Sequence, residues 1–360
     1  MVETLASHPA AAITDEIDDY SWVFGQSVDR LVTVEMRPTG LPYGKIDRLQ
    51  AAALAESGYR SQTLMAAEAL RRSVNPGDAV VIVTGAGTQP FIPKGENDGP
   101  VGAAALARTV LQGLDAVPVY LCEPHHADPI VASSEAAGVP IRPNGLEPRT
   151  ARGAFLETSP TVDDDVADWA SQMFDKYSPA AVIFIERLAP NRKGVIHGST
   201  GFAGWSPIVD LTPILDEATR RGAVSIGIGD AGNETGFGRI FDAVREIQES
   251  GAVCGCPCDD GMATITSTDI LVVASVSNWG AYAIDACLAH LLGRVDLPQP
   301  PETAARVIAA CFEGGGYEAV FCTQRDLVDG IDSQTSISLT QILKEMVRIS
   351  LLPTDSGPAH

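Results

Sequence analysis

Short runs of apolar residues recur along the chain, separated by longer segments whose apolar residues are spaced three and four apart. The runs are rich in Val, Ile and Ala, which is typical of strands buried on both faces of a sheet. We predict strands at residues 79–85, 117–123, 180–186, 223–230, 269–277 and 317–323. The spacing within 101–116, 162–177, 208–222 and 238–251 predicts amphipathic helices between them.

This alternation indicates the fold class. Strands that alternate with helices of this length form βαβ units and a parallel sheet. We therefore expect an α/β fold with a mostly parallel sheet and helices on both faces, in a single elaborated domain. A further helical stretch begins near residue 45 and ends at the turn of Pro76 and Gly77. The first 40 and last eight residues show no strong pattern, so we expect an N-terminal extension (1–44), an α/β domain (45–352) and a tail (353–360).

Composition and charge exclude several classes of partner. Hydrophobic residues make up 45% of the 360 residues and charged residues 20%, which is typical of a globular protein. The net charge of -21 argues against a nucleic-acid partner, because a phosphate backbone would be repelled. The longest apolar run has about seven residues, far fewer than the ~20 that span a bilayer, so we expect no membrane partner. A homo-oligomer is left open.

The cysteines and the first residues indicate the compartment. The chain starts with acidic residues and lacks the basic and apolar pattern of a signal sequence, so we expect a cytoplasmic protein. Its seven cysteines have no paired spacing and predict no disulfide framework. Cys254, Cys256 and Cys258 form a C-x-C-x-C string, and we expect no metal there because nothing else in the sequence completes a tetrahedral set.

Polar motifs follow several of the predicted strands, where ligands of open α/β sheets usually bind. After the first strand, "GENDGPVG" contains Asp98, which has the alternative interpretation of a helix cap before a Gly-Pro turn. Glu186 and Arg187 close the strand at 180–186, where a structural salt bridge is an equally open alternative. The next loop offers donors that would attract a carboxylate or phosphate: Arg187, Asn191, Arg192, Lys193 and His197.

Two further motifs end later strands. In "IGIGDAGNETGFGRI", Asp230, Asn233 and Glu234 stand among five glycines, which permit a close approach of the backbone to a ligand. The two acids are candidate oxygen ligands for Mn²⁺ or Mg²⁺, and the alternative is a glycine-rich turn with a capping Asp. Asn278 opens a helix after the strand at 269–277, and its alternative role is that of a helix cap.

Taken together, "GENDGPVGA", "IERLAPN", "GIGDAGNETGFGR" and "VSNWGAYA" resemble the D-glutamate cyclase family, specifically its C-terminal domain, from about residue 80 to about 292. The resemblance implies an α/β protein. It also implies an activity like that of the vertebrate family member, which is a mitochondrial enzyme that converts D-glutamate to 5-oxo-D-proline with loss of water. In that member the domain follows a separate hydro-lyase-like domain.

The residues and the resemblance together give our expectation for function. We expect a metal-assisted lyase of the D-glutamate cyclase type, with a small anionic substrate and Mn²⁺ or Mg²⁺ as cofactor. The expected metal ligands are Asp98, Asp230 and Glu234, and the expected catalytic residues are Glu186 and Glu234. The expected substrate-binding residues are Arg187, Asn191, Asn233 and Asn278. A Mn²⁺- or Mg²⁺-dependent phosphatase and a non-catalytic binding partner of a separate hydro-lyase are the alternatives.

Overall fold

The computed structural model describes residues 17–37, 43–143, 145–146, 152–203 and 208–352. Its centre is a sheet of parallel strands in the order β3-β2-β1-β4-β5-β6. The strands are β1 (Ala79–Thr84), β2 (Val117–Cys122), β3 (Phe155–Thr158), β4 (Ala181–Ile185), β5 (Val224–Gly229) and β6 (Ile270–Val273). The predicted α/β class and parallel sheet are therefore confirmed, and five of these strands overlap the predicted runs.

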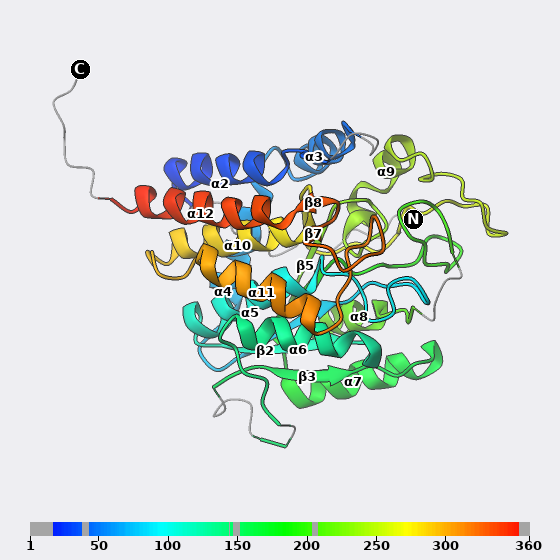
Figure 1. Cartoon of the computed structure of the whole chain (residues 1–360), viewed down its shortest axis with the longest axis horizontal. Coiled ribbons are helices and arrows are strands. Elements are labelled where there is room, and N and C mark those ends of the chain that lie inside the picture. Colours follow the sequence, from blue (N-terminus) through cyan, green and yellow to red (C-terminus); the bar gives the residue numbers. More distant parts are fainter. Residues whose placement is uncertain (1–16, 38–42, 144, 147–151, 204–207, 353–360) are drawn as a thin grey trace.

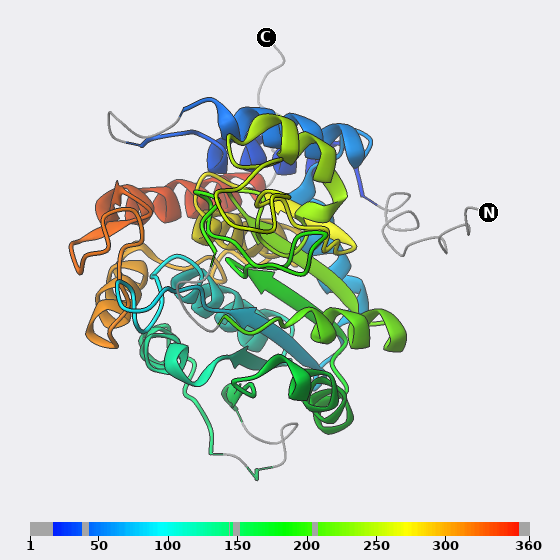
Figure 2. The ribbon, with the colours of Figure 1, turned by 90° about the vertical axis from the view of Figure 1, so that its right-hand side faces the viewer.

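Helices cover both faces of this sheet (Figures 1 and 2). They are α2 (Asp19–Val32), α3 (Lys45–Glu56), α4 (Gln62–Ser73), α5 (Pro100–Gly113), α6 (Ala127–Ala136), α7 (Val166–Tyr177), α8 (Thr212–Arg221), α9 (Phe241–Ile247), α10 (Ser277–Leu291), α11 (Pro301–Glu313) and α12 (Ser333–Ser350). Short 3-10 turns lie at η2 (Pro124–His126), η4 (Asp163–Asp165) and η5 (Phe237–Ile240). Within the described residues, no helix is long and apolar enough to cross a membrane.

Alternate residues of each strand enter different cores. Val80 and Ile82 of β1 pack with α4, α5 and α10, while Val81 and Val83 pack with α7 and α8. This two-residue alternation follows from the pleat of a strand, whose successive side chains point to opposite faces. Because both faces are covered, both sets of side chains must be apolar, which produces the continuous runs seen in the sequence.

The segment at 317–323 is not a strand, contrary to the prediction. Within the described part of the chain it makes isolated bridges, Glu96 with Tyr317 and Glu318 with Thr323. The Glu318 carboxylate accepts hydrogen bonds from the backbone N–H groups of Val320, at 2.9 Å, and Phe321, at 2.8 Å, which folds the segment into a loop. A small hairpin follows, formed by β7 (Leu327–Val328) and β8 (Ile331–Asp332).

Strand β3 is not among the predicted strands. It occupies the edge of the sheet beside β2, with Phe155 buried, the next two residues half-buried and Thr158 exposed. An edge strand of four residues with one buried side chain leaves no apolar run to detect. The sixth strand of the sheet therefore comes from before α7 rather than from residues 317–323.

The N-terminal residues contain a helix where no strong pattern was expected. In α2 the Asp18 side chain accepts a hydrogen bond from Ser21 N at 2.7 Å, a helix cap. Phe24, Val28 and Val32, spaced four apart, are buried in the same core as α4 and α10. The part of residues 1–44 that the structure describes is thus packed onto the α/β domain.

The single helical stretch expected from residue 45 is two helices. Gly58 and Tyr59 have positive φ angles of 71° and 62°, which no α-helix accommodates, and they separate α3 from α4. Ser61 then caps α4, because its side chain accepts a hydrogen bond from Leu64 N.

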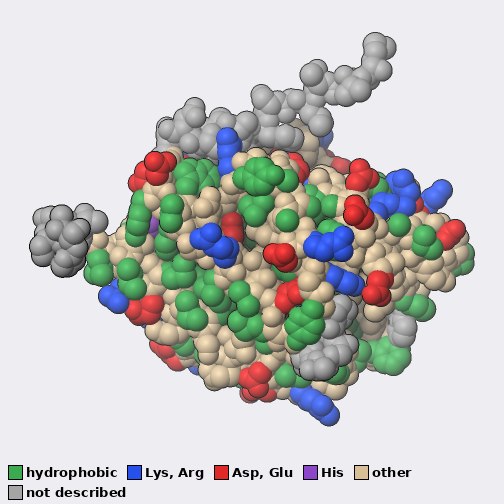
Figure 3. Space-filling view, turned by 90° about the horizontal axis from the view of Figure 1, so that it is seen from above, with side chains coloured by type: hydrophobic (Ala, Val, Ile, Leu, Met, Phe, Trp, Pro, Cys, Tyr) green, Lys and Arg blue, Asp and Glu red, His purple; other side chains and the backbone are tan. Residues whose placement is uncertain are grey.

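On the face of the molecule drawn in Figure 3, acidic, basic and hydrophobic side chains are interspersed.

Candidate active site

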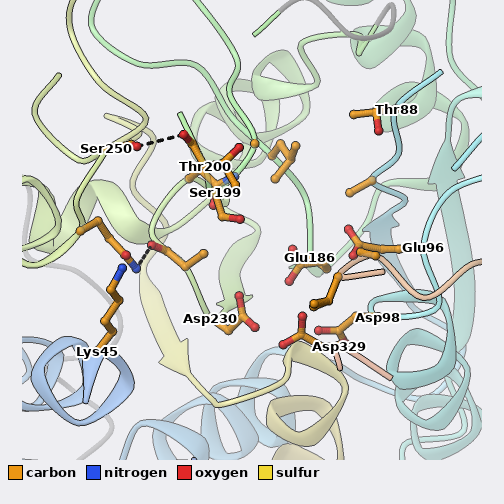
Figure 4. Close-up of a pocket in the computed structure, with 18 of the residues that line it drawn as sticks. Lys45, Thr88, Glu96, Asp98, Glu186, Ser199, Thr200, Asp230, Ser250 and Asp329 are labelled. Carbon is orange, nitrogen blue, oxygen red and sulfur yellow. Dashed lines mark hydrogen bonds between the residues drawn. The ribbon is translucent and has the colours of Figure 1, made fainter. Parts of the chain in front are cut away.

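A cavity of about 530 Å³ lies at the carboxyl ends of the parallel strands (Figure 4). It is lined by loops that follow β1, β4 and β5, by the β7–β8 turn, and by residues before α3. Strands β2 and β3 lie on one side of β1, whereas β4, β5 and β6 lie on its other side. Between β1 and β4 the connections after the two strands therefore lead away in opposite directions, which leaves a crevice at their carboxyl ends. The strand order therefore explains the position of the cavity.

Three carboxylates from two strand ends converge in this region. Glu186 directly follows β4, Asp230 directly follows β5, and Glu234 belongs to the loop between β5 and η5. One oxygen from each lies within 4.8 Å of the others, a spacing that a single metal ion can bridge. Figure 4 shows Glu186 and Asp230 facing the same space as Asp98. Asp98 lines the cavity with Glu186 and Asp230, whereas Glu234 is not among the lining residues. Of the expected ligands Asp98, Asp230 and Glu234, the set of three contains Asp230 and Glu234, and its third member is Glu186.

Glu234 also holds its own loop together. It is fully buried, and its carboxylate accepts hydrogen bonds from the N–H groups of Asp230 (3.2 Å), Ala231 (2.9 Å) and Gly232 (2.7 Å). The glycines are required by this close packing: a Cβ at Gly229 would lie 2.9 Å from the Glu234 carboxyl carbon. Gly232 has a φ of 104°, which favours glycine. The glycine-rich stretch is thus folded around a buried carboxylate.

Asp98 and Asn278 cap each other's helices. The Asp98 carboxylate accepts from the N–H groups of Ser277, at 2.8 Å, and Asn278, at 2.7 Å, at the start of α10. In return, Asn278 Oδ1 accepts from the N–H groups of Gly99 (3.0 Å) and Gly102 (2.6 Å) at the start of α5. Both side chains therefore cap a helix, as the alternatives proposed, but each caps the other's helix and not the helix next to it in the sequence. Substrate binding by Asn278 stays a prediction, and it would have to displace these bonds.

Burial raises the pKa of the acids in this region, and the charges of neighbouring acids add to the shift for Asp98, Glu186 and Asp230. Burial raises the pKa of Asp98 to about 7, and the nearby charge of Asp329 adds to the shift. The pKa of Glu186 is raised well above its ordinary value by burial and then by the charges of Glu234 and Asp230. Burial also raises the pKa of Asp230 and of Glu234. A cation placed among these groups would offset the repulsion that adds to the effect of burial.

Six charged residues of the cavity are not among the predicted site residues: Glu35, Arg37, Lys45, Glu96, Glu249 and Asp329. Arg37 Nη2 donates to Asp230 Oδ2 at 2.9 Å and to Asp329 Oδ2 at 2.5 Å. It precedes α3, whereas Asp329 lies in the β7–β8 turn. Local patterns could not find these partners, because they are separated from Asp230 by many residues.

Arg187 is engaged outside the cavity. It is almost fully buried, and its guanidinium makes two hydrogen bonds to the Glu123 carboxylate, at 2.6 and 2.7 Å. It also donates to the carbonyl oxygens of Gly85, at 2.8 Å, and Val209. Of the two alternatives for Arg187, a functional site or a structural salt bridge, these contacts match the salt bridge. Its partner is Glu123 and not Glu186. Substrate binding by Arg187 stays a prediction that these contacts do not favour.

The donor-rich loop after β4 is likewise tied to the protein. Arg192 forms an ion pair with Asp260, and Asn191 Nδ2 donates to Gly261 O at 2.8 Å. Asn233 differs, because it lines the cavity and its buried Oδ1 atom has no hydrogen-bond partner among the described residues. Of the four residues expected to bind substrate, Asn233 has the contacts that suit the role best.

The expectation for the cysteines rested on a wrong premise. A fourth ligand is present: one atom each from His197, Cys254, Cys256 and Cys258 lies within 4.8 Å of the others. His197 is separated from the cysteines by more than fifty residues, so no local spacing could reveal the set.

Comparison with known proteins agrees with the motifs. The chain matches the family model described as D-glutamate cyclase-like, C-terminal, over residues 47–346. It is also 29% identical, over 226 residues, to the human protein named D-glutamate cyclase, mitochondrial. The aligned part covers 61% of this chain and 34% of the human protein, so the alignment spans about a third of that relative. Since the family model covers most of the sequence, the chain belongs to the D-glutamate cyclase-like, C-terminal family.

Proposed function

We propose that the protein is a metal-assisted enzyme of the D-glutamate cyclase type, converting D-glutamate to 5-oxo-D-proline and water. The observation that carries the proposal is that Glu186 and Asp230, which line the cavity, converge with Glu234 within 4.8 Å. The family and the name of the human relative support the choice of reaction. The position at the reversal of strand order supports the choice of site.

The donor set fits a hard divalent cation. Carboxylate oxygens are the ligands that Mn²⁺ and Mg²⁺ prefer, and Glu186, Asp230 and Glu234 would hold the ion. Asp98 lies in the same cavity as a further acid. When bound, the cation would supply positive charge that polarises a carboxyl group and stabilises developing negative charge.

The charge of the cavity makes substrate binding depend on the cation. A dicarboxylate such as glutamate would be repelled by the cavity carboxylates of Glu96, Asp98, Glu186, Asp230 and Asp329. The described cations of the cavity are Arg37, which is paired with Asp230 and Asp329, and Lys45 at the rim. We therefore propose that the cation binds first, and that Lys45 and the unpartnered Asn233 Oδ1 then orient the substrate.

Cyclisation requires proton transfers that the buried acids can carry out. A bond forms between the amine nitrogen and the side-chain carboxyl carbon, a carbon–oxygen bond breaks, and both protons lost by the ammonium group end on the departing water. Glu186 is our candidate for moving these protons, because it lines the cavity where the substrate would bind and a carboxylate can accept and return a proton. Ser277 Oγ donates to Glu186 Oε2 at 2.5 Å and would fix its orientation.

The test is turnover by the full chain after removal of divalent metal. We expect formation of 5-oxo-D-proline from D-glutamate, detected by chiral chromatography, to require added Mn²⁺ or Mg²⁺. Asp230→Asn should lower turnover by ~10²-fold, the scale for losing a group of the site. Glu246→Gln, at an exposed position on α9, is the matched control and should be unaffected. Turnover that is insensitive to chelation would contradict the metal proposal.

A second candidate is a binding module that acts with a separate hydro-lyase. The observation that favours it is that the aligned part covers 34% of the human relative, so the activity of that whole protein need not reside in this part. In that case calorimetry would show metal-dependent binding of D-glutamate, while no divalent metal would give turnover. A phosphatase is less favoured, because Arg187 and Arg192 of the donor-rich loop are paired with acids. Hydrolysis of a generic phosphate ester by the purified protein would instead favour the phosphatase.

A further inference from the structure

Three cysteines and one histidine converge between two loops beside the cavity. His197 belongs to the loop between β4 and α8, and the cysteines belong to residues 248–269, which connect α9 to β6 without helix or strand. The four ligand atoms lie within 4.8 Å of one another. This cluster is separate from Glu186, Asp230 and Glu234, and the proposed reaction does not use it.

The distances within the cluster are a few tenths of an ångström from those of a tetrahedral metal site. Cys254 Sγ lies 3.4 Å from Cys256 Sγ and 3.3 Å from Cys258 Sγ. The Nε2 atom of His197 lies 3.3 Å from Cys256 Sγ and 3.6 Å from Cys258 Sγ. Ligands at ~2.3 Å (sulfur) and ~2.0 Å (nitrogen) from a tetrahedral zinc ion are separated by ~3.5–3.8 Å. The thiols are all free, and a disulfide would require ~2.05 Å.

The histidine is oriented as a metal ligand. Its ring is buried, with 1% of its surface exposed, and Nδ1 lies 3.1 Å from the carbonyl oxygen of Val195. Donation of the Nδ1 proton to that carbonyl leaves Nε2 without a proton and facing the sulfurs. Metal-ligating histidines typically use their second nitrogen in this way, which fixes the tautomer and the ring orientation.

The sulfur atoms receive hydrogen bonds from outside the ligand set. Asn191 Nδ2 donates to Cys258 Sγ at 3.4 Å, and the backbone N–H of Cys258 donates to Cys256 Sγ at 3.4 Å. Such donors stabilise thiolates around a metal. Asn191 Oδ1 also accepts from the N–H groups of Lys193 (2.9 Å) and Val195 (3.1 Å), so one side chain organises the loop that carries His197.

We propose that His197, Cys254, Cys256 and Cys258 bind a structural zinc ion. Thiolate and imidazole ligands select zinc over the Mn²⁺ or Mg²⁺ that carboxylates prefer. Four protein ligands fill the tetrahedron and leave no open position for a substrate, which is typical of structural rather than catalytic zinc.

The zinc would stabilise one wall of the active-site cavity. It joins the loop that carries Gly198, Ser199 and Thr200 to the loop that follows Ser250, and all four of these residues line the cavity. Ser250 Oγ already donates to Thr200 O at 2.9 Å (Figure 4). Loops of this length without secondary structure need such cross-links, and the binding energy of a structural metal contributes to folding.

Two measurements on the unmodified full chain test the proposal. Protein purified under reducing conditions should contain stoichiometric zinc by elemental analysis. After zinc removal, added Co²⁺ should give the sulfur-to-cobalt charge-transfer bands of a tetrahedral thiolate site. Zinc-free protein without these bands would overturn the proposal, as would a disulfide between these cysteines that persists under reducing conditions.

Variants assign the site to these residues. His197→Ala and Cys256→Ser should lose the stoichiometric zinc, whereas Cys322→Ser, at an exposed cysteine outside the cluster, should keep it. Asn191→Ala should weaken zinc binding by roughly 10–100-fold in a chelator competition, the usual effect of removing a hydrogen bond to a ligand. Full zinc retention in His197→Ala would contradict the proposal. If a cysteine variant does not fold, the cobalt spectrum of the unmodified chain still decides.

Discussion

Replacing Glu234 with glutamine keeps the shape of the side chain while removing one charge and one acceptor oxygen. In the unmodified protein the Glu234 carboxylate accepts hydrogen bonds from three N–H groups, and both of its oxygens take part. A glutamine that keeps the bonds to Asp230 and Ala231 turns its own NH₂ group towards the N–H of Gly232. That donor is then left buried without an acceptor.

The size of the effect follows from these contacts. An unpaired buried donor costs ~1–3 kcal/mol. Unfolding entropy of ~2.1 cal/mol/K per residue amounts to ~0.8 kcal/mol/K for 360 residues. The melting temperature of Glu234→Gln should therefore fall by roughly 1–4 °C. Because the charge is also lost from the proposed cation site, Mn²⁺ binding should weaken roughly tenfold or more and turnover should fall by ~10²-fold.

The assay measures both quantities on one preparation. Thermal unfolding in the presence of chelator reports the loop, and calorimetric titration with Mn²⁺ reports the site. Glu246→Gln provides the same chemical change at an exposed position of α9. A lowered melting temperature with unchanged Mn²⁺ affinity would show that Glu234 holds the loop and is no ligand. An unchanged melting temperature would refute the reasoning from the three hydrogen bonds.

Two further predictions concern buried charges. The pKa of Asp98 is about 7 in the folded protein and ordinarily 3.8, so its contribution to stability is present at low pH and is lost as pH rises through 7. Urea unfolding of metal-free protein should therefore show a free energy of unfolding that falls, because of this group, by up to roughly 1.4 kcal/mol per pH unit between about pH 4 and 7. Asp98→Asn should flatten that slope. An equal slope in both proteins would be evidence against a raised pKa of Asp98. Arg187→Ala should destabilise the protein by ~3–5 kcal/mol in urea unfolding, because the buried Glu123 loses its arginine partner and keeps contacts only to His126 and the N–H of Val209. A stable Arg187→Ala protein with weakened substrate binding would instead support the substrate-binding prediction.

The sequence by itself determined the layers of the fold and the place of the site. Strands β1, β2, β4, β5 and β6 were predictable because burial on both faces demands continuous apolar runs, which is a local property. Asp98, Glu186 and Asp230 could be assigned to one edge because ligands of parallel sheets bind at the carboxyl ends of the strands. The family was recognisable because its motifs are contiguous strings at those same ends.

Only the tertiary structure decided which side chains meet. Arg37 reaches Asp230 and Asp329, and His197 completes the cysteine cluster, across large separations in sequence. Tertiary packing sets these contacts, since Arg37 precedes α3, Asp329 lies in the β7–β8 turn, and His197 follows β4 while the cysteines precede β6. Hydrophobic periodicity records whether a residue is buried, but it carries no information about its distant partner. For that reason the sequence identified the polar residues at the strand ends, while their roles as ligands, caps or ion-pair partners depended on the packing of the whole chain.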